Sequence, residues 1–298
     1  MAHTRTTPPR PLDIAAVFPE LAPLARRAIR LHPRPGAPTP SDSSVGGPLL
    51  WPARHPWPLC ERWHEGPRAP LVPVAQLYAG DIPLLRPPGR NDLLQILWCP
   101  AEHPPLHAPP VELHWRVAAE VTDPLTDPPR PVDVEFPQYV PVPCLLAPEE
   151  ITDYPDSMEL GEELLEAVAD PGEWRARGID WEEYATPDPY GDDARPEDFY
   201  RADLGAAPGW KAGGWAPWGL TDPVPRFCVD CGGRMTPLLT IPSDEWEPGR
   251  ESWVPAEERA LAHVPDAAEP TGVTIQSGHH LQLYVCGSCP WSTDCLVQ

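Results

Sequence analysis

Short apolar runs bounded by proline and glycine recur along the chain, and their length predicts β-strands. A strand buried on both faces reads as about four to eight consecutive apolar residues, whereas a half-buried strand alternates polar and apolar residues. The continuous runs are Val72–Leu77, Leu93–Cys99, Pro237–Ile241, Gly272–Ile275 and Leu281–Val285, and the alternating runs are Glu112–Val117 and Val132–Phe136. The pattern predicts a mainly β fold with some helix, in the α+β class.

Two segments show the spacing of an amphipathic helix instead. The apolar positions of residues 12–27 favour a helix or helix pair that is broken near Pro19 and Pro23 and packs on the first of the two repeats described below. Further along, one helical face carries Leu160, Leu164, Leu165 and Val168, and glutamates occupy the rest of that helix. The stretch 186–203 has little apolar content and is expected to be a loop.

Three sequence blocks occur twice in the same order, which indicates two tandem repeats of a β-rich unit. Gly46-Gly47 precedes Trp51 and Cys60, as Gly213-Gly214 precedes Trp218 and Cys228. The segments 73–77 and 237–241 match, and so do 94–99 and 281–286. We therefore divide the chain into residues 1–40 (leader and amphipathic helix), 41–145 (first repeat), 146–207 (acidic, partly helical connector) and 208–298 (second repeat).

Charge is distributed unevenly. The 298 residues carry a net charge of −22, and residues 149–203 alone hold 19 acidic residues against 4 arginines. This disfavours direct binding of nucleic acid, which requires clustered Lys and Arg. It favours a basic protein partner, although the same charge could serve only solubility.

Composition restricts the class of protein further. The chain has 48 Pro and 21 Gly, but its 13 Trp argue for a folded protein because so much aromatic surface is normally buried. No apolar run reaches the length that crosses a bilayer, and the N-terminus lacks a secretory pattern. We expect a cytoplasmic protein with no membrane partner, and the sequence leaves its oligomeric state open.

Cysteine spacing gives the strongest indication of a site. Cys228-x2-Cys231 and Cys286-x2-Cys289 place two pairs of thiols in glycine-containing turns, an arrangement that holds a structural zinc ion with four sulfur ligands. The alternative is four reduced thiols, two of which face the core. Four thiolates leave no open position, so a catalytic zinc is not expected.

The first repeat has a second candidate metal set at the matching places. Cys60-x3-His64 and Cys99-x3-His103 offer two sulfurs and two imidazoles, which is also a zinc ligand set. The alternative is a site that has been lost, with its cysteines buried.

The Gly-Gly turns and the nearby aromatic residues form a candidate binding groove. Lys211 is the only lysine beside 21 arginines, and it directly precedes a Gly-Gly pair. The candidate groove residues are Lys211, Gly213, Gly214, Trp215, Trp218, Gly46, Gly47 and Trp51. An extended peptide could bind there. In the simpler interpretation the tryptophans belong to the core, and the glycines permit positive φ or close backbone approach.

The motifs of the second repeat also match a family pattern. They are Lys211-Ala212-Gly213-Gly214, Cys228-x2-Cys231-Gly232-Gly233, the strand 237–241 and the closing 281–286 block, and residues 43–52 and 74–77 look like the same unit in the first half. The chain resembles the YwqG-like and programmed cell death protein 2 superfamily over most of 41–100 and 208–298. It departs from the pattern at Thr240, where Gln is usual, and in the incomplete cysteine sets of the first half.

The resemblance implies a β-rich fold and binding of proteins. Eukaryotic members are linked to ribosome biogenesis as chaperones of a basic ribosomal protein, and some bacterial relatives sit near toxin genes. No nucleophile elbow, two-His zinc helix or dinucleotide-binding glycine motif is present. Our main hypothesis is a non-enzymatic chaperone or adaptor for a basic client. The alternatives are an immunity protein that blocks a toxin and an enzyme that acts on a small molecule.

Overall fold

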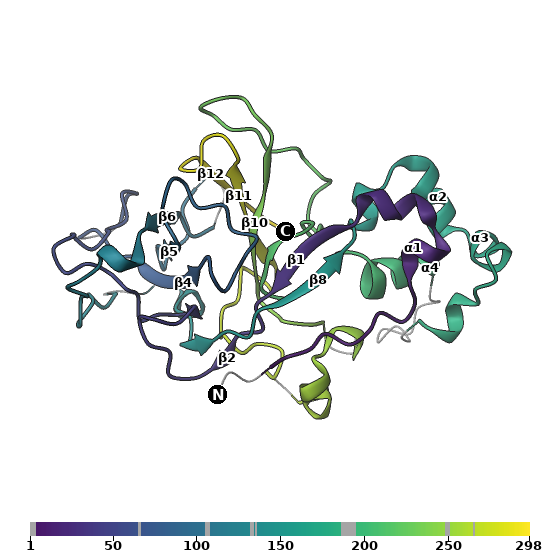
Figure 1. Cartoon of the computed structure of the whole chain (residues 1–298), viewed down its shortest axis with the longest axis horizontal. Coiled ribbons are helices and arrows are strands. Elements are labelled where there is room, and N and C mark those ends of the chain that lie inside the picture. Colours follow the sequence, from purple (N-terminus) through teal and green to yellow (C-terminus); the bar gives the residue numbers. More distant parts are fainter. Residues whose placement is uncertain are drawn as a thin grey trace.

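Two antiparallel six-stranded sheets form the body of the protein (Figure 1). The computed structural model describes residues 4–64, 67–104, 108–131, 134, 136–185, 195–247, 251–264 and 266–298. Sheet A has the order β12-β11-β10-β9-β1-β8, and sheet B has the order β2-β7-β3-β4-β5-β6. The expected mainly β architecture of the α+β class is confirmed.

The strands of sheet A are β1 (Arg26–Arg30), β8 (Glu149–Asp153), β9 (Lys211–Gly213), β10 (Met235–Pro242), β11 (His280–Cys286) and β12 (Thr293–Val297). The strands of sheet B are β2 (Arg34–Pro35), β3 (Ser44–Val45), β4 (Val72–Tyr78), β5 (Leu93–Trp98), β6 (Val111–Arg116) and β7 (Cys144–Leu145). The apolar runs at 72–77, 93–99, 237–241 and 281–285 and the alternating run at 112–117 therefore form strands. The run Gly272–Ile275 does not: only Ile275 forms an isolated bridge, to His279. The expected strand at 132–136 lies largely outside the described residues.

The central strands of the two sheets pair in the same way. β4 pairs with β5 and β10 pairs with β11, and each pairing has one register shift, between Pro73 and Ala75 in β4 and between Pro237 and Leu239 in β10. β3 precedes and pairs with β4, as β9 precedes and pairs with β10. The strand order and the bulge position thus agree between the sheets.

Two segments cross from one sheet to the other. Residues 26–35 provide β1 to sheet A and β2 to sheet B, and residues 144–153 provide their partners β8 and β7. The predicted boundaries at residues 40 and 145 therefore need correction, because the N-terminal segment is an integral part of both sheets. Long-range strand pairing of this kind leaves no local sequence signal.

The sheets share one apolar core. It contains Ile29, Leu31, Val45, Val72, Val74, Leu77, Leu94, Ile96, Trp98, Leu239, Ile241, Leu281 and Leu283, among others. All residues of β5 are buried, since Leu94, Ile96 and Trp98 face this core while Leu97 faces a second cluster on the opposite side. Burial on both faces explains why β5 reads as a continuous apolar run.

A helical lobe lies beyond the N-terminal end of β1 and the C-terminal end of β8, at the right of Figure 1. Its helices are α1 (Ile14–Val17), α2 (Glu162–Ala169), α3 (Pro171–Ala176) and α4 (Pro196–Phe199), with a π-helical turn over Tyr200–Leu204. Short 3-10 helices occur at Pro19–Leu24, Ala118–Glu120, Pro137–Tyr139, Ser157–Glu159, Trp181–Glu183, Glu251–Trp253 and Ala256–Leu261.

The lobe has its own core, which joins the N-terminal helix to the acidic connector. Ile14, Phe18 and Leu21 pack against Val168 and Trp174. The N-terminal helix therefore packs on the connector, and the expectation that it packs on the first repeat was wrong. The expected loop at 186–203 is helical from residue 196 onward, and residues 186–194 lie outside the description. No helix in the described part of the chain is both long enough and apolar enough to cross a bilayer.

Candidate functional site

The four cysteines of the second repeat meet at one end of sheet A. Cys228 and Cys231 lie in the turn that leads into β10, Cys286 ends β11, and Cys289 lies in the turn between β11 and β12. Met235, the first residue of β10, pairs with Cys286, the last residue of β11, so the two turns lie side by side. The four sulfur atoms lie within 4.8 Å of one another.

The first of these turns is closed by backbone hydrogen bonds. The Cys228 N–H donates to the carbonyl of Gly233 at 2.8 Å, and the Gly232 N–H donates back to the carbonyl of Cys228 at 2.8 Å. Gly232 has φ +69, a left-handed conformation that glycine adopts without strain. The sequence Cys-x-x-Cys-Gly-Gly thus folds locally into a tight turn that directs both thiols to one point.

The thiols are already polarised by their neighbours. The Sγ atoms of Cys231 and Cys286 are 3.5 Å apart, and the Cys289 N–H points at Cys286 Sγ at 3.3 Å. The hydrogen bond from Ser292 lowers the pKa of Cys228 to about 6, whereas hydrogen bonding to Cys231 helps raise the pKa of Cys289 to about 12. The four sulfurs cannot all be thiolates without a cation between them.

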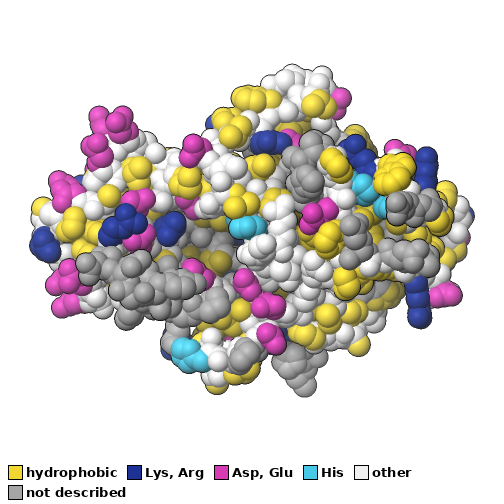
Figure 2. Space-filling model, turned by 180° about the vertical axis from the view of Figure 1, so that it is seen from behind, with side chains coloured by type: hydrophobic (Ala, Val, Ile, Leu, Met, Phe, Trp, Pro, Cys, Tyr) yellow, Lys and Arg dark blue, Asp and Glu magenta, His cyan; other side chains and the backbone are white. Residues whose placement is uncertain are grey.

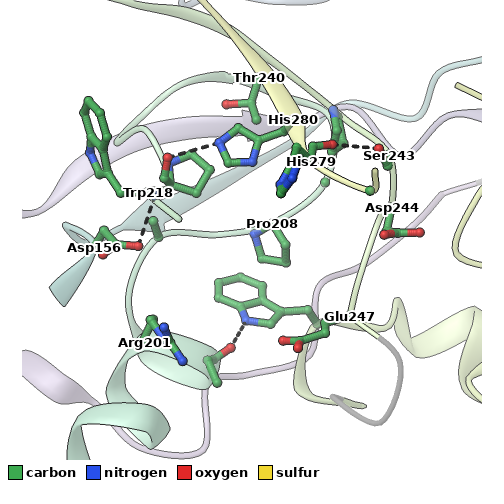
Figure 3. Close-up of a pocket in the computed structure, with 17 residues that line it drawn as sticks. Asp156, Arg201, Pro208, Trp218, Thr240, Ser243, Asp244, Glu247, His279 and His280 are labelled. Atoms are coloured by element: carbon green, nitrogen blue, oxygen red, sulfur yellow. Dashed lines mark hydrogen bonds between the residues drawn. The ribbon is translucent and has the colours of Figure 1, made fainter. Parts of the chain in front are cut away.

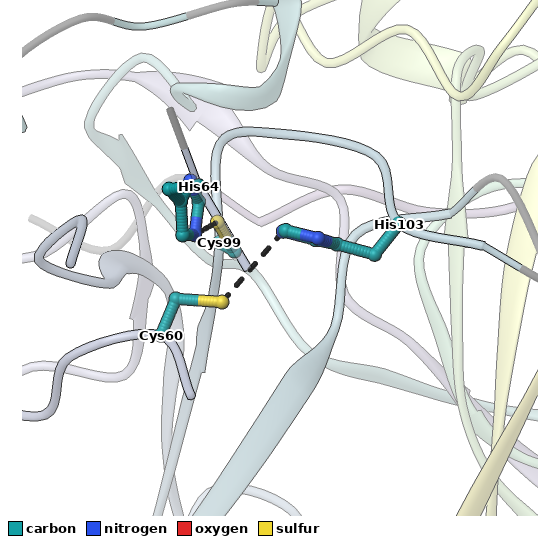
Figure 4. Close-up of side chains that lie close together, drawn as sticks. All are labelled: Cys60, His64, Cys99 and His103. Carbon is teal, nitrogen blue, oxygen red and sulfur yellow. Dashed lines mark hydrogen bonds between the residues drawn. The ribbon is translucent and has the colours of Figure 1, made fainter. Parts of the chain in front are cut away.

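The first repeat brings Cys60, His64, Cys99 and His103 together as well (Figure 4). Cys60 Sγ lies 3.7 Å from His103 Nε2, and Cys99 Sγ lies 3.6 Å from His64 Nε2. The two imidazole rings meet edge to face with their centroids 4.8 Å apart. The ligand atoms of the four side chains all lie within 4.8 Å of one another, and both cysteines are buried.

Both cysteine clusters occupy the same place in their sheets. Cys99 follows the last residue of β5, and Cys286 is the last residue of β11. The residue before Cys60 forms an isolated bridge to Pro70, just as the residue before Cys228 forms one to Arg234. Each cluster therefore lies where the turn that precedes one central strand (β4 or β10) meets the C-terminal end of the neighbouring central strand (β5 or β11).

Lys211 does not line a groove. Its side chain is fully buried, and Nζ donates to Asp153 Oδ2 at 2.8 Å and to the Trp215 carbonyl at 2.9 Å. Asp153, on β8, also accepts hydrogen bonds from the N–H groups of Ala207 at 2.7 Å and Trp215 at 2.8 Å. The single lysine thus belongs to a buried ion pair that joins β8, β9 and the following turn.

The Gly-Gly pairs permit close backbone approach, as the simpler interpretation expected. All four glycines have φ between +70 and +83. A Cβ on Gly214 would lie 2.3 Å from Asp153 Oδ2, and a Cβ on Gly46 would lie 2.9 Å from the carbonyl of Pro141. Both glycine pairs lie where the backbone packs directly against neighbouring segments inside the fold. The prediction that they shape an open groove was therefore wrong.

The tryptophans of the predicted groove are buried. Trp51 lies under the Arg116 guanidinium, whose carbon is 4.1 Å from the ring centroid, and Trp215 lies under Arg26 at 3.2 Å. Trp218 is 7% exposed, and its indole N–H donates to Glu159 Oε1 at 2.6 Å. Of the predicted groove residues, Trp218 is the one that lines the cavity described next.

A cavity of about 430 Å³ lies between sheet A and the helical lobe (Figure 3). It is lined by Asp156, Arg201, Trp218, Thr240, Asp244 and His280, with other residues from the same segments. Burial lowers the pKa of His280 to about 4, so its imidazole is neutral at pH 7. Sequence reasoning missed this cavity because its walls come from five separated segments that have no common motif. The chain matches no protein-family profile and no curated protein.

Proposed function

We propose that the protein is a non-enzymatic chaperone or adaptor that binds a basic client protein. The observation that carries this proposal is the acidic surface of the helical lobe. Its exposed carboxylates include Glu162, Glu163, Glu166, Asp170, Asp180, Glu182 and Glu183. Figure 2 shows acidic side chains spread over the lobe, at the left of that view.

The lobe presents its charge on an ordered scaffold. Trp174 and Val168 are fully buried, so the helices that carry the exposed glutamates are fixed by their own core. Carboxylates held on such a scaffold attract a basic protein and speed its association, and salt weakens the attraction. The resemblance to the YwqG-like and programmed cell death protein 2 superfamily points in the same direction.

The test is affinity capture of the tagged protein at low salt, followed by identification of the bound proteins. We expect one dominant basic protein that rising salt releases. A triple variant, Glu162→Gln with Glu163→Gln and Glu166→Gln, should retain much less of it. The matched control removes three exposed charges outside the lobe, with Asp123→Asn, Asp127→Asn and Asp222→Asn, and should retain the client.

Two outcomes would contradict this proposal. Retention of the client by the lobe variant would show that the acidic surface does not steer binding. Capture of no stoichiometric basic partner would move weight to the small-molecule alternative, whereas capture of a toxin would favour the immunity role. The proposal places the protein in the cytoplasm, where thiols such as its eight free cysteines remain reduced.

We also infer that the two sheets derive from a duplicated unit. Their common strand order and bulge position support this, and so does a polar pair buried at the same register: Gln76 with Gln95 in sheet B and Thr240 with Gln282 in sheet A. The duplication makes the two cysteine clusters counterparts of each other, which supports assigning both the same role.

That role, we propose, is to hold one structural zinc ion in each cluster. In a tetrahedral site with Zn–S bonds of about 2.3 Å, neighbouring sulfurs lie about 3.8 Å apart. The 3.5 Å between Cys231 and Cys286 and the 3.6 and 3.7 Å sulfur–nitrogen distances of the other cluster fit this geometry. Four protein ligands leave no open position, so each ion would fix two turns against each other.

Metal content measured on purified protein tests the zinc proposal. We expect about two zinc ions per chain, one fewer in Cys228→Ser with Cys286→Ser, and one fewer in Cys60→Ser with Cys99→Ser. Cys144→Ser with Cys295→Ser, which lie outside both clusters, should keep two. Metal-free protein that melts at the same temperature before and after zinc addition would refute the assignment.

A further inference from the structure

The cavity between sheet A and the helical lobe combines carboxylates with aromatic walls. Figure 3 shows Asp156 and Trp218 on one side and Asp244 and Glu247 on the other, with His280 above them. The cavity volume of about 430 Å³ lies within the range of about 300 to 1,000 Å³ that is typical of ligand sites. On the face seen in Figure 2, the molecule is hollowed between the lobe and the sheets.

The charge of the cavity is negative. Its ionisable side chains are the three carboxylates, the guanidinium of Arg201 and the imidazoles of His279 and His280. Arg201 also lies 3.5 Å from Asp198, outside the cavity, so its charge is shared. Desolvation and the neighbouring Glu269, Glu247 and Glu245 raise the pKa of Asp244 to about 6. At pH 7 this carboxylate is mostly ionised, and a bound cation would relieve the repulsion that it experiences.

The aromatic walls offer surface rather than hydrogen-bond donors. The indole N–H of Trp218 is used by Glu159, and that of Trp253 donates to the Ala202 carbonyl at 2.7 Å. The guanidinium carbon of Arg10 lies 3.3 Å from the ring centroid of Trp253, so this ring already takes part in a cation–π contact. Carboxylates beside apolar walls complement a side chain that has an aliphatic stem and a cationic head.

We propose that this cavity binds a lysine or arginine side chain of the client protein. This inference rests on the proposed function and names its specificity site. The cavity is continuous with the acidic lobe, because Arg201 and Ala202 line it from the π-helical turn that follows α4. The lobe attracts the basic client, and the cavity holds one of its cationic side chains between Asp156 and the Asp244–Glu247 pair.

Short peptides test the cavity directly. The probes are acetyl-Gly-Lys-Gly-amide, acetyl-Gly-Arg-Gly-amide and, as a neutral control, acetyl-Gly-Gln-Gly-amide, titrated at millimolar concentration against the full chain. Binding is followed by the indole N–H NMR signals of Trp218 and Trp253. We expect a basic peptide to shift both signals and the neutral peptide to shift neither.

A matched pair of variants distinguishes binding in the cavity from general attraction by the negative charge of the protein. Asp244→Asn with Glu247→Gln should weaken binding of the basic peptide at least about tenfold, because each lost charge-assisted hydrogen bond contributes roughly a factor of ten. Asp123→Asn with Asp127→Asn removes the same charge at exposed positions and should change the affinity less than about twofold.

Three results would overturn the cavity proposal: no shift of either indole signal, equal weakening by both double variants, or tighter binding of free spermidine than of either basic peptide. These results are distinguishable from failure of the proposed function. If the cavity proposal fails while the lobe variant still loses its client, the chaperone role stands. If a basic peptide binds in the cavity but no basic client is captured, the role fails and the site stands.

Discussion

The buried ion pair between Lys211 and Asp153 makes the sharpest prediction about stability. Replacing Lys211 by Met keeps most of the side-chain volume but removes the ammonium from a fully buried position. Among the described residues, the Asp153 carboxylate then loses its one charged hydrogen-bond donor and keeps the two N–H groups of Ala207 and Trp215. The Trp215 carbonyl loses the ammonium as its partner as well.

The expected loss of unfolding free energy follows from these contacts. Removing one partner of a buried ion pair costs about 3 to 5 kcal/mol, because the other charge remains buried without compensation. The two N–H donors still solvate Asp153, which places Lys211→Met near the lower end, at about 3 kcal/mol. A domain with a typical stability of about 5 to 15 kcal/mol would still fold, so the variant can be measured.

The exposed pair formed by Arg27 and Glu150 is the matched control. It also involves β8, which it joins to β1, but the side chains are 60% and 50% exposed. Arg27→Met should therefore cost far less stability than Lys211→Met. Denaturant unfolding of the wild type, both single variants, Asp153→Asn and the double variant Lys211→Met with Asp153→Asn gives the comparison and the coupling energy. We expect the double variant to cost less than the sum of its single variants.

A cost for Lys211→Met no larger than that of Arg27→Met would refute this account. Additivity of Lys211→Met and Asp153→Asn would refute it too, because residues in direct contact must couple. Either result would mean that the buried pair does not stabilise the fold in the way that its contacts imply.

Three further predictions concern single positions. Gly214→Ala should destabilise the protein by several kcal/mol in the same unfolding assay, because its Cβ would lie 2.3 Å from Asp153 Oδ2. The control is Gly178→Ala, where φ is also positive (+80) but no atom lies close to the new Cβ. It should cost only about 1 to 2 kcal/mol of left-handed backbone strain. The pKa of His280 is about 4 in the folded protein and about 6.5 in the unfolded chain. As the pH drops from about 6.5 to about 4, only the unfolded chain binds the proton, so the free energy of unfolding should decrease over this range. His280→Gln should remove up to about 3 kcal/mol of that fall, and unchanged pH profiles would contradict the assignment. Asp244→Asn should stabilise the protein at pH 8 by about 1 kcal/mol after solvent screening, and the gain should vanish below about pH 4, where the aspartate is protonated in both states.

The central strands and the two Cys and Cys/His clusters could be predicted because their signals are local. β4, β5, β10 and β11 are buried on both faces or nearly so, and such strands read as continuous apolar runs between prolines and glycines. The Cys-x-x-Cys turns combine ligand chemistry with glycines that permit tight turns. The second cluster could be found by position within the repeat, because Cys60 and Cys99 match Cys228 and Cys286.

The remaining features depend on partners far away in the chain. β1 pairs with β8 across more than a hundred residues, and the sequence around Arg26–Arg30 reads as a short strand with no indication of its partner. Lys211 looked like a ligand-binding residue because a lone lysine beside glycines is unusual, but its partner Asp153 lies on another element. The tryptophans of the expected groove are buried for the same reason: their covering arginines, Arg26 and Arg116, come from other strands.

The placement of ion pairs explains why the excess of negative charge remains on the lobe. Basic residues of the N-terminal segment pair with acidic residues outside the lobe: Arg5 and Arg34 both bind Glu258, and the His32 imidazole contacts Glu149. Within the lobe, Arg177 pairs with Glu173 and Arg195 pairs with Asp198, whereas the glutamates of α2 face solvent. Solubility alone would be served by acidic residues on any face. The concentration of acidic residues on one lobe beside a negatively charged cavity supports the proposed basic client. Relocating three of them to the face of sheet B should preserve solubility while sharply reducing capture.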